Sequence, residues 1–295
     1  MKAVPERQSV QVGGATAGYW HVPAPAGSPR LLFIHGLGAS NHIWEPLARA
    51  LPEGLELFAL DLPGSGASPP RGALGPPELA LFVLEFLGAL GLSAVDLVAG
   101  HSLGGAVALE LGLVAPARVG GLLIFNAAPA LPWLTRLGLR APGMERLMSL
   151  PGVMPRPRGP TRFFTQLYLS AIFGERGRVT DEVVDGYSRL AHDPQYFANM
   201  AATVQGFARH RRSLTELTRL TLPISVVWGE RDPVFPVSLA ERLVRVLPGA
   251  TLHRLPRVGH CPPQEDPTLV AALTTELLGR VRRAAATRPR PASPR

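Results

Sequence analysis

Residues 98–106 read Val98-Ala99-Gly100-His101-Ser102-Leu103-Gly104-Gly105-Ala106, and this stretch decides the fold predicted for the chain of 295 residues. Its Gly-x-Ser-x-Gly pattern follows the short apolar run 95–99 and opens the helical pattern 103–114. A serine on a sharp strand-to-helix turn needs glycines on both sides, because a Cβ atom there would clash. The free N–H groups at the start of the helix would then point at the serine. The pattern predicts that Ser102 is a nucleophile rather than an incidental serine in a glycine-rich turn.

Apolar runs alternate with helical patterns on both sides of this turn. The runs that predict strands are 31–34, 55–60, 95–99, 122–125, 224–228 and 251–255, after a hairpin of 8–12 and 15–20. Such runs without polar alternation are typical of strands buried on both faces of a sheet. The helical patterns between them are 43–51, 77–90, 103–114, 237–247 and 267–283. The sequence therefore predicts an α/β fold with a mostly parallel, doubly wound sheet.

The alternation of strands and helices stops in the middle of the chain. Residues 130–220 contain many prolines and glycines, several short helical patterns and no good strand run. We expect residues 1–129 and 221–283 to form one core and residues 130–220 to be an inserted helical cap. The tail, residues 284–295, is dominated by Arg, Pro and Ala and is expected to be disordered.

Composition excludes several classes of protein. With 46% hydrophobic and 18% charged residues the chain is not disordered throughout. No uninterrupted apolar stretch reaches about 18 residues, so no integral membrane segment is expected. The beginning of the chain has no apolar signal-peptide core, and the single cysteine, Cys261, cannot form an internal disulfide. These features favour a cytoplasmic protein, and the sequence leaves its oligomeric state open.

The net charge of +8 is concentrated in two places. Residues 130–219 and residues 280–295 each carry an excess of six positive charges. A nucleic-acid-binding protein would interleave basic residues with stacking aromatics in a known module, and this chain does not, so we expect no nucleic-acid partner. The basic middle segment could steer anionic substrates, but we expect Arg156, Arg158 and the cluster Arg209-His210-Arg211-Arg212 to be solvated surface.

Two later strand ends carry residues that could activate Ser102. A serine needs a base that is oriented by a third group. The run 224–228 leads into Gly229-Glu230-Arg231-Asp232, and the run 251–255 is followed by Gly259-His260. Because the carboxyl ends of parallel strands line one crevice, we expect His260 and an acid to meet Ser102 there. Either Glu230 or Asp232 could supply that acid on position alone.

The turn after the first parallel strand predicts further site residues. His35-Gly36-Leu37-Gly38 follows the run 31–34, so the backbone N–H groups of Leu37 and Leu103 are expected to form an oxyanion hole. Each such donor lowers the barrier by about 3 kcal/mol. The candidate substrate-binding residues are Gly36, His101 and Trp44, although His101 could instead point into packing. No metal-ligand cluster or dinucleotide fingerprint occurs, so no metal or cofactor is expected.

These motifs resemble the α/β-hydrolase superfamily, and specifically its serine members with a helical lid after the sixth strand. The matching stretches, in the expected order, are 35–36, 61–68, 98–106, 229–236, 259–260 and 265–267. The resemblance implies an acyl-enzyme mechanism without metal or organic cofactor. It also implies the catalytic triad Ser102, Asp232 and His260, with Asp232 rather than Glu230 as the acid.

The resemblance leaves several functions to be compared. A serine carboxylic ester hydrolase acting on a small to medium, fairly apolar ester is the first expectation, with a small molecule as the only partner. Alternatives are a C–C bond hydrolase acting on an anionic vinylogous keto acid and a lid-gated acyltransferase. A hydrolase-derived ligand receptor is the non-enzymatic alternative. Relatives that remove halides or open epoxides use Asp at the nucleophile position, so Ser102 disfavours both activities.

Overall fold

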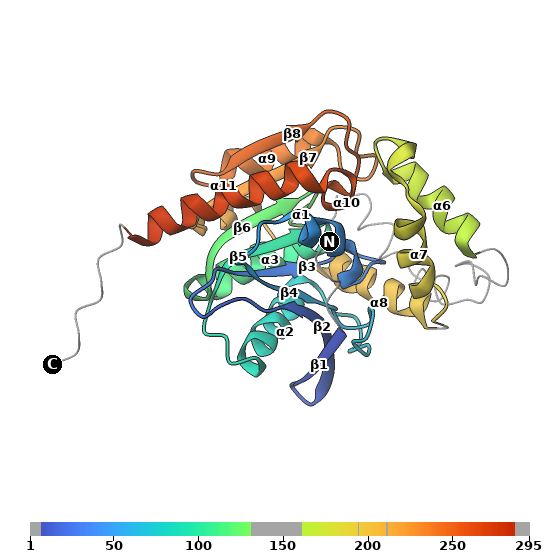
Figure 1. Ribbon diagram of the computed structural model, residues 1–295, viewed down its shortest axis with the longest axis horizontal. Helices are drawn as coiled ribbons and strands as arrows, with labels where there is room; N and C mark the ends of the chain where they lie inside the picture. Colours follow the sequence, from blue (N-terminus) through green and yellow to red (C-terminus); the bar gives the residue numbers. More distant parts are fainter. Residues whose placement is uncertain (1–6, 131–160, 194, 211, 287–295) are drawn as a thin grey trace.

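The protein is described by a computed structural model that covers residues 7–130, 161–193, 195–210 and 212–286 (Figure 1). These residues build an eight-stranded sheet with the strand order β1-β2-β4-β3-β5-β6-β7-β8. Its strands are β1 (Arg7–Val12), β2 (Ala15–Val22), β3 (Arg30–Ile34), β4 (Glu56–Leu60), β5 (Val95–His101), β6 (Val119–Phe125), β7 (Ile224–Gly229) and β8 (Thr251–Leu255). The predicted strand runs all lie in this sheet.

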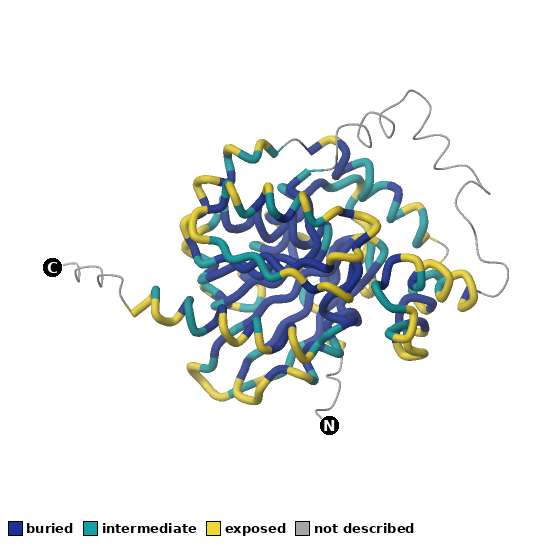
Figure 2. The backbone as a smooth tube through the Cα atoms, turned by 90° about the horizontal axis from the view of Figure 1, so that it is seen from above, coloured by how far each residue is buried: buried dark blue, intermediate teal, exposed yellow. Residues whose placement is uncertain are grey.

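Parallel pairing joins the strands from β3 to β8, and only β1 and β2 are antiparallel. The central strands are apolar because helices cover both of their faces, and every residue of β7 is buried. Figure 2 shows the buried strands as a dark layer at the centre of the molecule. The predicted doubly wound α/β fold is confirmed.

Helices of the core divide between the two sheet faces (Figure 1). On one face lie α2 (Pro76–Ala89), α3 (Leu103–Val114) and α9 (Val237–Val246). On the other lie α1 (Glu45–Ala50), the short α10 (Pro262–Glu265) and α11 (Pro267–Ala286). The described residues also form four 3-10 turns: η1 (Asn41–Trp44), η2 (Pro116–Arg118), η3 (Arg176–Arg178) and η4 (Leu214–Arg219). Because α3 packs between the sheet and α2, ten of its twelve residues are buried.

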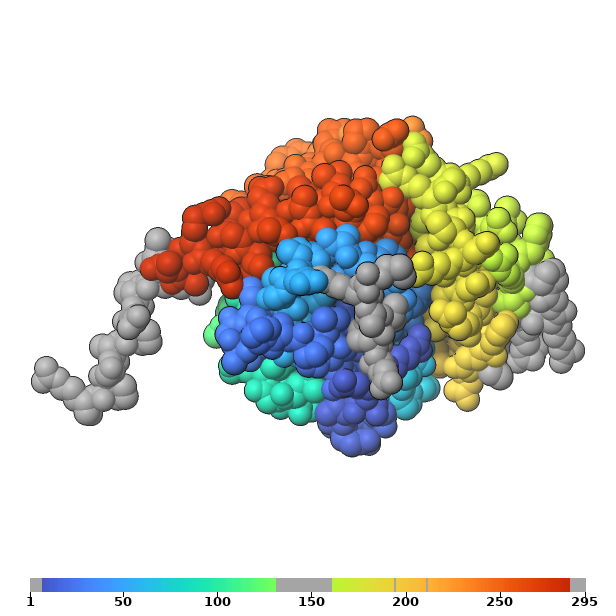
Figure 3. Space-filling view, viewed as in Figure 1, coloured from blue at the N-terminus to red at the C-terminus, as the bar shows by residue number. Residues whose placement is uncertain are grey.

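A helical segment lies between β6 and β7, as the pause in strand runs predicts. Its described helices are α6 (Thr161–Ile172), α7 (Asp181–Leu190) and α8 (Tyr196–Arg209). They form one lobe at the right of Figure 3, beside the core. Residues 131–160 of the predicted cap lie outside the described residues, and the division into core 1–129 with 221–283 and cap 130–220 stays a prediction.

The end of the core helix differs from the expectation. Helix α11 runs through Ala286, three residues beyond its predicted end at residue 283. Alanines 284–286 extend the helix because alanine has the highest helix propensity. The remainder of the predicted tail lies outside the described residues.

Candidate active site

Ser102 lies on the sharp turn between β5 and α3. Its backbone has a φ of 53° and a ψ of −116°, a left-handed conformation that costs energy for a residue other than glycine. A Cβ on Gly100 would lie 2.2 Å from the carbonyl oxygen of Gly104, and one on Gly104 would lie 2.1 Å from that of Ile34. Only glycine fits at either position. The strained turn therefore has the geometry that the Gly-x-Ser-x-Gly pattern predicts.

The acid nearest to His260 is Asp232. His260 Nδ1 donates a hydrogen bond of 2.9 Å to Asp232 Oδ2. The other carboxylate oxygen, Oδ1, accepts from the backbone N–H groups of Val234 at 2.7 Å and Phe235 at 3.1 Å. Burial by itself would raise the pKa of Asp232, but the hydrogen bond and charge of His260 and the other donors outweigh it and lower the pKa below its usual value.

Glu230, the competing acid on sequence position, has a different partner. Its carboxylate accepts a hydrogen bond of 2.6 Å from Arg254 Nε, and both side chains are partly exposed. The geometry therefore favours Asp232 as the partner of His260.

Asn126 is a site residue that the sequence did not reveal. Its Nδ2 donates to Asp232 Oδ2 at 2.6 Å, and its Oδ1 accepts from the N–H of Gly229 at 3.1 Å. Asn126 is fully buried at the end of β6 and has a positive φ of 41°, which asparagine tolerates better than most residues. It ties the acid to the neighbouring strand end. The signal that could have found it is an asparagine directly after a buried strand.

His101 connects the nucleophile turn to the His260 loop. Its Nε2 donates a hydrogen bond of 2.8 Å to the backbone oxygen of His260, and the two rings meet edge to face with centroids 4.9 Å apart. Burial, with the neighbouring His260 ring, lowers the pKa of His101 to about 3, so its ring is neutral. Ser102 and His260 thus lie on adjoining loops, although no hydrogen bond joins their side chains in the described residues. Such bonds often tighten only when substrate binds.

The predicted oxyanion donors lie on two adjoining turns. A Cβ on Gly36 would be 3.0 Å from Ser102 Cβ, so the turn that carries Leu37 packs directly against the nucleophile. Leu103 is the first residue of α3, where backbone N–H groups have no partner within the helix. Within the described residues the N–H groups of Leu37 and Leu103 donate no hydrogen bond. Both are therefore available to an oxyanion.

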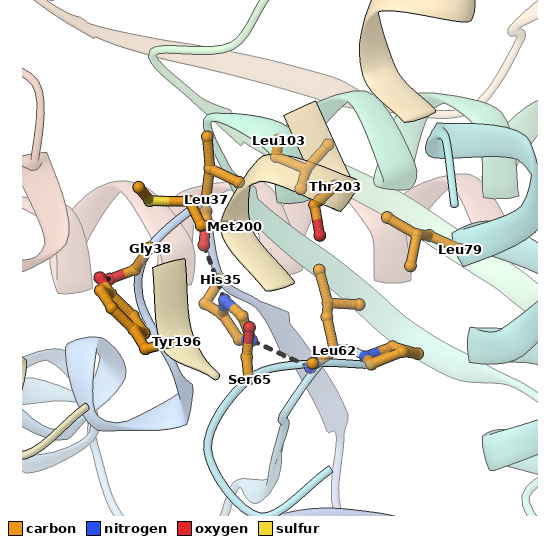
Figure 4. Close-up of a pocket in the computed structure, with 13 residues that line it drawn as sticks. His35, Leu37, Gly38, Leu62, Ser65, Leu79, Leu103, Tyr196, Met200 and Thr203 are labelled. Atoms are coloured by element: carbon orange, nitrogen blue, oxygen red, sulfur yellow. Dashed lines mark hydrogen bonds between the residues drawn. The ribbon is translucent and has the colours of Figure 1, made fainter. Parts of the chain in front are cut away.

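A small pocket opens between these turns and helix α8 (Figure 4). Its free space is about 10 Å³, enough for roughly one water molecule. The side chains on its walls are mostly apolar: Leu37, Leu62, Leu79, Leu103 and Met200. His35 connects the turn at Gly36 to the loop at Leu62. Its Nδ1 donates a hydrogen bond of 2.8 Å to the carbonyl of Gly36, and its Nε2 accepts one of 2.9 Å from Leu62 N–H.

Of the three candidate substrate-binding residues, only Gly36 lines this pocket. Trp44 is fully buried against Phe33 and Phe125 under the sheet, with ring centroids 5.1 and 5.9 Å away, so its assignment to substrate binding is wrong. Its indole is large enough to fill the core between sheet and helix. His101 is 4% exposed and binds the His260 backbone, so it holds the loop rather than lining the pocket.

The carboxylate of Glu265 accepts hydrogen bonds from the backbone of the His260 loop. The backbone N–H groups of Gly259 and Cys261, on either side of His260, donate to this carboxylate at 2.9 to 3.0 Å. Gly174, just beyond the end of α6, donates to the same group at 2.7 Å. The N–H of His260 itself donates to the carbonyl of Ile172 at 2.8 Å. The inserted helices therefore contact the His260 loop directly.

The basic cluster near the end of α8 is solvated surface only in part. Arg209 is exposed, as expected, whereas His210 is buried and Arg212 is partly buried. Arg156, Arg158 and Arg211 lie outside the described residues.

Arg212 donates hydrogen bonds to both oxygens of Glu110, which is 1% exposed on α3, and His210 Nε2 lies 3.2 Å from the same carboxylate. Burial alone would raise the pKa of Glu110, but the hydrogen bonds from His210 and Arg212 lower it. The expectation for His210 and Arg212 is wrong because a buried carboxylate requires such partners. They attach the end of the inserted segment to α3.

In the described residues, no group of three His, Cys, Asp or Glu side chains is arranged to hold a metal ion. None of the helices in those ranges is long and apolar enough to cross a membrane.

Comparison with known proteins agrees with this geometry. The model of a family described as "Alpha/beta hydrolase family" matches residues 31–273. The chain is 34% identical over 247 residues to "Putative carbamate hydrolase RutD" of Variovorax paradoxus (strain S110), covering 82% of this chain and 88% of that protein. It is 27% identical over 283 residues to "Uncharacterized hydrolase YugF" of Bacillus subtilis (strain 168), covering 92% and 97%.

A solved structure shows the same fold. The thermophilic esterase from Thermogutta terrifontis aligns with a TM-score of 0.77 at 22% identity, covering 94% of this chain and 99% of that one. The chain belongs to the alpha/beta hydrolase family, as its motifs predicted, and it is an enzyme of the hydrolase type.

Proposed function

We propose that this protein is a serine hydrolase that cleaves small to medium, fairly apolar carboxylic esters through an acyl-enzyme. The observation that carries the proposal is the strained backbone of Ser102, with its φ of 53°, at the N-terminus of α3. A conformation that costs energy persists where the surrounding structure imposes it, and such strain is concentrated at active sites. The Asp232–His260 pair on the neighbouring strand ends supplies the base.

The proposed reaction begins with proton transfer. Because His260 Nδ1 donates to Asp232, its Nε2 is the ring atom that takes the proton from Ser102 Oγ as that oxygen attacks the ester carbonyl. The carbonyl electrons move onto oxygen, where the Leu37 and Leu103 N–H groups stabilise the negative charge. His260 then gives its proton to the departing alcohol, which leaves Ser102 acylated. Water attacks the acyl group with the same base, releases the acid and restores the serine.

Asp232 acts through His260 rather than on the substrate. Its carboxylate favours the ring tautomer with hydrogen on Nδ1 and stabilises the imidazolium that forms during attack. Four donors surround it: the His260 ring, the Asn126 amide and the N–H groups of Val234 and Phe235. These donors keep the carboxylate ionised, consistent with its lowered pKa.

The pocket supports a short, apolar acyl group. Leucines and a methionine line it, and because its free space of about 10 Å³ holds roughly one water molecule, even a short acyl chain requires side chains on its walls to move. Long acyl chains would have to displace α8, which carries Met200 and Thr203 on the pocket wall.

The test is hydrolysis of p-nitrophenyl butyrate by the full-length wild type and by Ser102→Ala. We expect the variant to lose at least about 1,000-fold in kcat while its melting temperature stays within a few degrees of the wild type. The matched control is Ser28→Ala, in the loop between β2 and β3 and outside the residues assigned to the active site, which should retain full activity. A fluorophosphonate probe should label the wild type and the control but not Ser102→Ala. Butyrate hydrolysis retained by Ser102→Ala would refute the proposal.

Carbamate hydrolysis is a second candidate, favoured by the name of the 34% identical relative. A carbamate carbonyl can be attacked by the same serine, base and oxyanion hole. Comparing p-nitrophenyl butyrate with a p-nitrophenyl carbamate separates the two by kcat/KM. Adding a carboxylate-bearing dienone and an alcohol acceptor to the panel detects C–C cleavage or acyl transfer, and slow single-turnover acylation with retained product would indicate a receptor.

A further inference from the structure

A second cavity lies beside the small pocket, which is lined by Leu37 and Leu103 on the two turns next to Ser102 but not by Ser102 itself. It is a groove of about 560 Å³ between the core and helices α7 and α8. Four charged side chains line it: Arg7, Glu45, Arg189 and Asp193. The groove therefore carries charges of both signs, whereas no Asp, Glu, Lys or Arg side chain of the described residues lines the pocket beside it.

Among the residues that the structure describes, three line both cavities: Gly64, Ser65 and Tyr196. Two of them have small side chains or none, so the ring of Tyr196 is the main side chain between the pocket and the groove. Figure 4 shows it beside Gly38, at the edge of the pocket lined by Met200 and Leu37.

Contacts with the core hold Tyr196 in this position. Its hydroxyl donates a hydrogen bond of 2.7 Å to the carbonyl oxygen of Gly38. A Cβ on Gly38 would lie 3.1 Å from that hydroxyl and 3.3 Å from Met200 Sδ, so α8 packs tightly against the turn. Burial raises the pKa of Tyr196 to about 12, so the hydroxyl remains a donor at neutral pH. On its other side the ring meets Phe197 edge to face at 5.0 Å.

We propose that Tyr196 is a specificity-determining residue that limits the length of the substrate by closing the catalytic pocket off from the groove. This inference rests on the proposed ester hydrolysis at Ser102. It assigns the enzyme to short-chain esters, because a longer acyl chain meets the tyrosine ring before it reaches the groove. Removal of the ring joins a pocket whose described walls carry no charged side chain to a charged groove, so the enlarged site suits a long chain with polar atoms in its outer part.

The test uses two matched series of p-nitrophenyl esters with acyl chains of equal length, one alkyl and one containing ether oxygens. The wild type should prefer the shortest members of both series. In Tyr196→Ala the ratio of kcat/KM for the eight-atom chain to that for the four-atom chain should rise by about 10-fold or more. The rise should be larger in the ether series, because the groove is charged.

Two control variants separate the ring from its hydrogen bond and from pocket size. Tyr196→Phe keeps the ring but loses the bond to Gly38, and it should keep the short-chain preference. Met200→Ala enlarges the pocket at a residue that does not line the groove, so any rise in the length ratio should be smaller than in Tyr196→Ala and equal in the alkyl and ether series. If Tyr196→Ala does not fold, Tyr196→Leu, which also lacks the aromatic ring, takes its place with the same expected direction.

Failure of this inference and failure of the proposed function are distinguishable. A wild type that hydrolyses no ester and reacts with no fluorophosphonate would refute ester hydrolysis itself. An active wild type together with a folded, labelled Tyr196→Ala that keeps the wild-type length ratio would refute the role of Tyr196 alone. A long-chain gain in Tyr196→Phe or Met200→Ala equal to that in Tyr196→Ala would also contradict the role of the ring.

Discussion

Lowering the pH from 7.5 to 5 should destabilise this protein strongly, because three buried histidines cannot accept protons in the folded state. Burial lowers the pKa of His35 to about 4, and burial together with neighbouring positive charges lowers the pKa values of His42 and His101 to about 3, from 6.5 in each case. The Nε2 of His35 also accepts a hydrogen bond from Leu62 N–H, which protonation would remove. All three side chains are at most 5% exposed.

The direction of the stability change follows from the number of protons bound in the folded and unfolded states. Between the folded pKa values and 6.5, the unfolded chain binds protons on these side chains and the folded chain does not, so stability falls as the pH falls. At pH 5 this costs about 2 kcal/mol for each histidine, or about 6 kcal/mol together. Asp61 acts in the opposite direction: burial raises its pKa to about 6, so the folded state gains a proton that the unfolded state lacks. This proton uptake by folded Asp61 stabilises the folded state by about 1 kcal/mol at pH 5.

The net loss of about 5 kcal/mol is comparable with the whole stability of many proteins. The assay is urea unfolding followed by circular dichroism at pH 7.5, 6, 5.5 and 5. The slope of the unfolding free energy near pH 5 should correspond to about two protons taken up on unfolding, or about 3 kcal/mol per pH unit. His42→Gln removes one titrating group and should reduce that slope by about one proton.

Constant stability between pH 7.5 and 5 would refute the assignment of these histidines as neutral and buried. A His42→Gln variant with the wild-type slope would refute it for His42 alone. The comparison uses slopes because a constant loss of stability caused by the substitution itself does not affect them.

Two other substitutions test single contacts. Asn126→Ala removes the amide that binds Asp232, so kcat for p-nitrophenyl butyrate should fall about 10- to 100-fold with little change in KM, and a wild-type kcat would contradict that role. Glu110→Gln breaks the buried contacts with Arg212 and His210 and should lower the free energy of unfolding by about 3 kcal/mol in urea titrations. The exposed Glu53→Gln should change it by less than about 0.5 kcal/mol, and an equal effect of the two variants would contradict the structural role of Glu110.

The strained serine turn illustrates what local sequence can establish. Gly100 and Gly104 lie on either side of Ser102 because the turn places their missing Cβ atoms against backbone oxygens, and that steric need appears directly in the pattern. The catalytic candidates Asp232 and His260 follow strand runs in the same way, and parallel strands bring their ends together whatever the intervening residues are.

Periodicity and turn chemistry determined the α/β class, the parallel sheet, the inserted helical segment and the order of the three candidate catalytic residues. These properties are legible because a strand buried on both faces must be apolar along its whole length, and a sharp turn must contain glycine. Each of these constraints acts on a few neighbouring residues, so it can be recognised from one short stretch of sequence.

Tertiary structure alone decided the partners of individual polar side chains. Asn126 meets Asp232, Tyr196 meets Gly38 and Glu110 meets Arg212 across more than 100 residues of sequence in each case. Trp44 became a core residue for the same reason, since its neighbours Phe33 and Phe125 come from two different strands. The sequence pattern around a residue indicates whether its side chain is buried. The group that the side chain contacts depends on how elements distant in sequence pack together, and local sequence does not encode that packing.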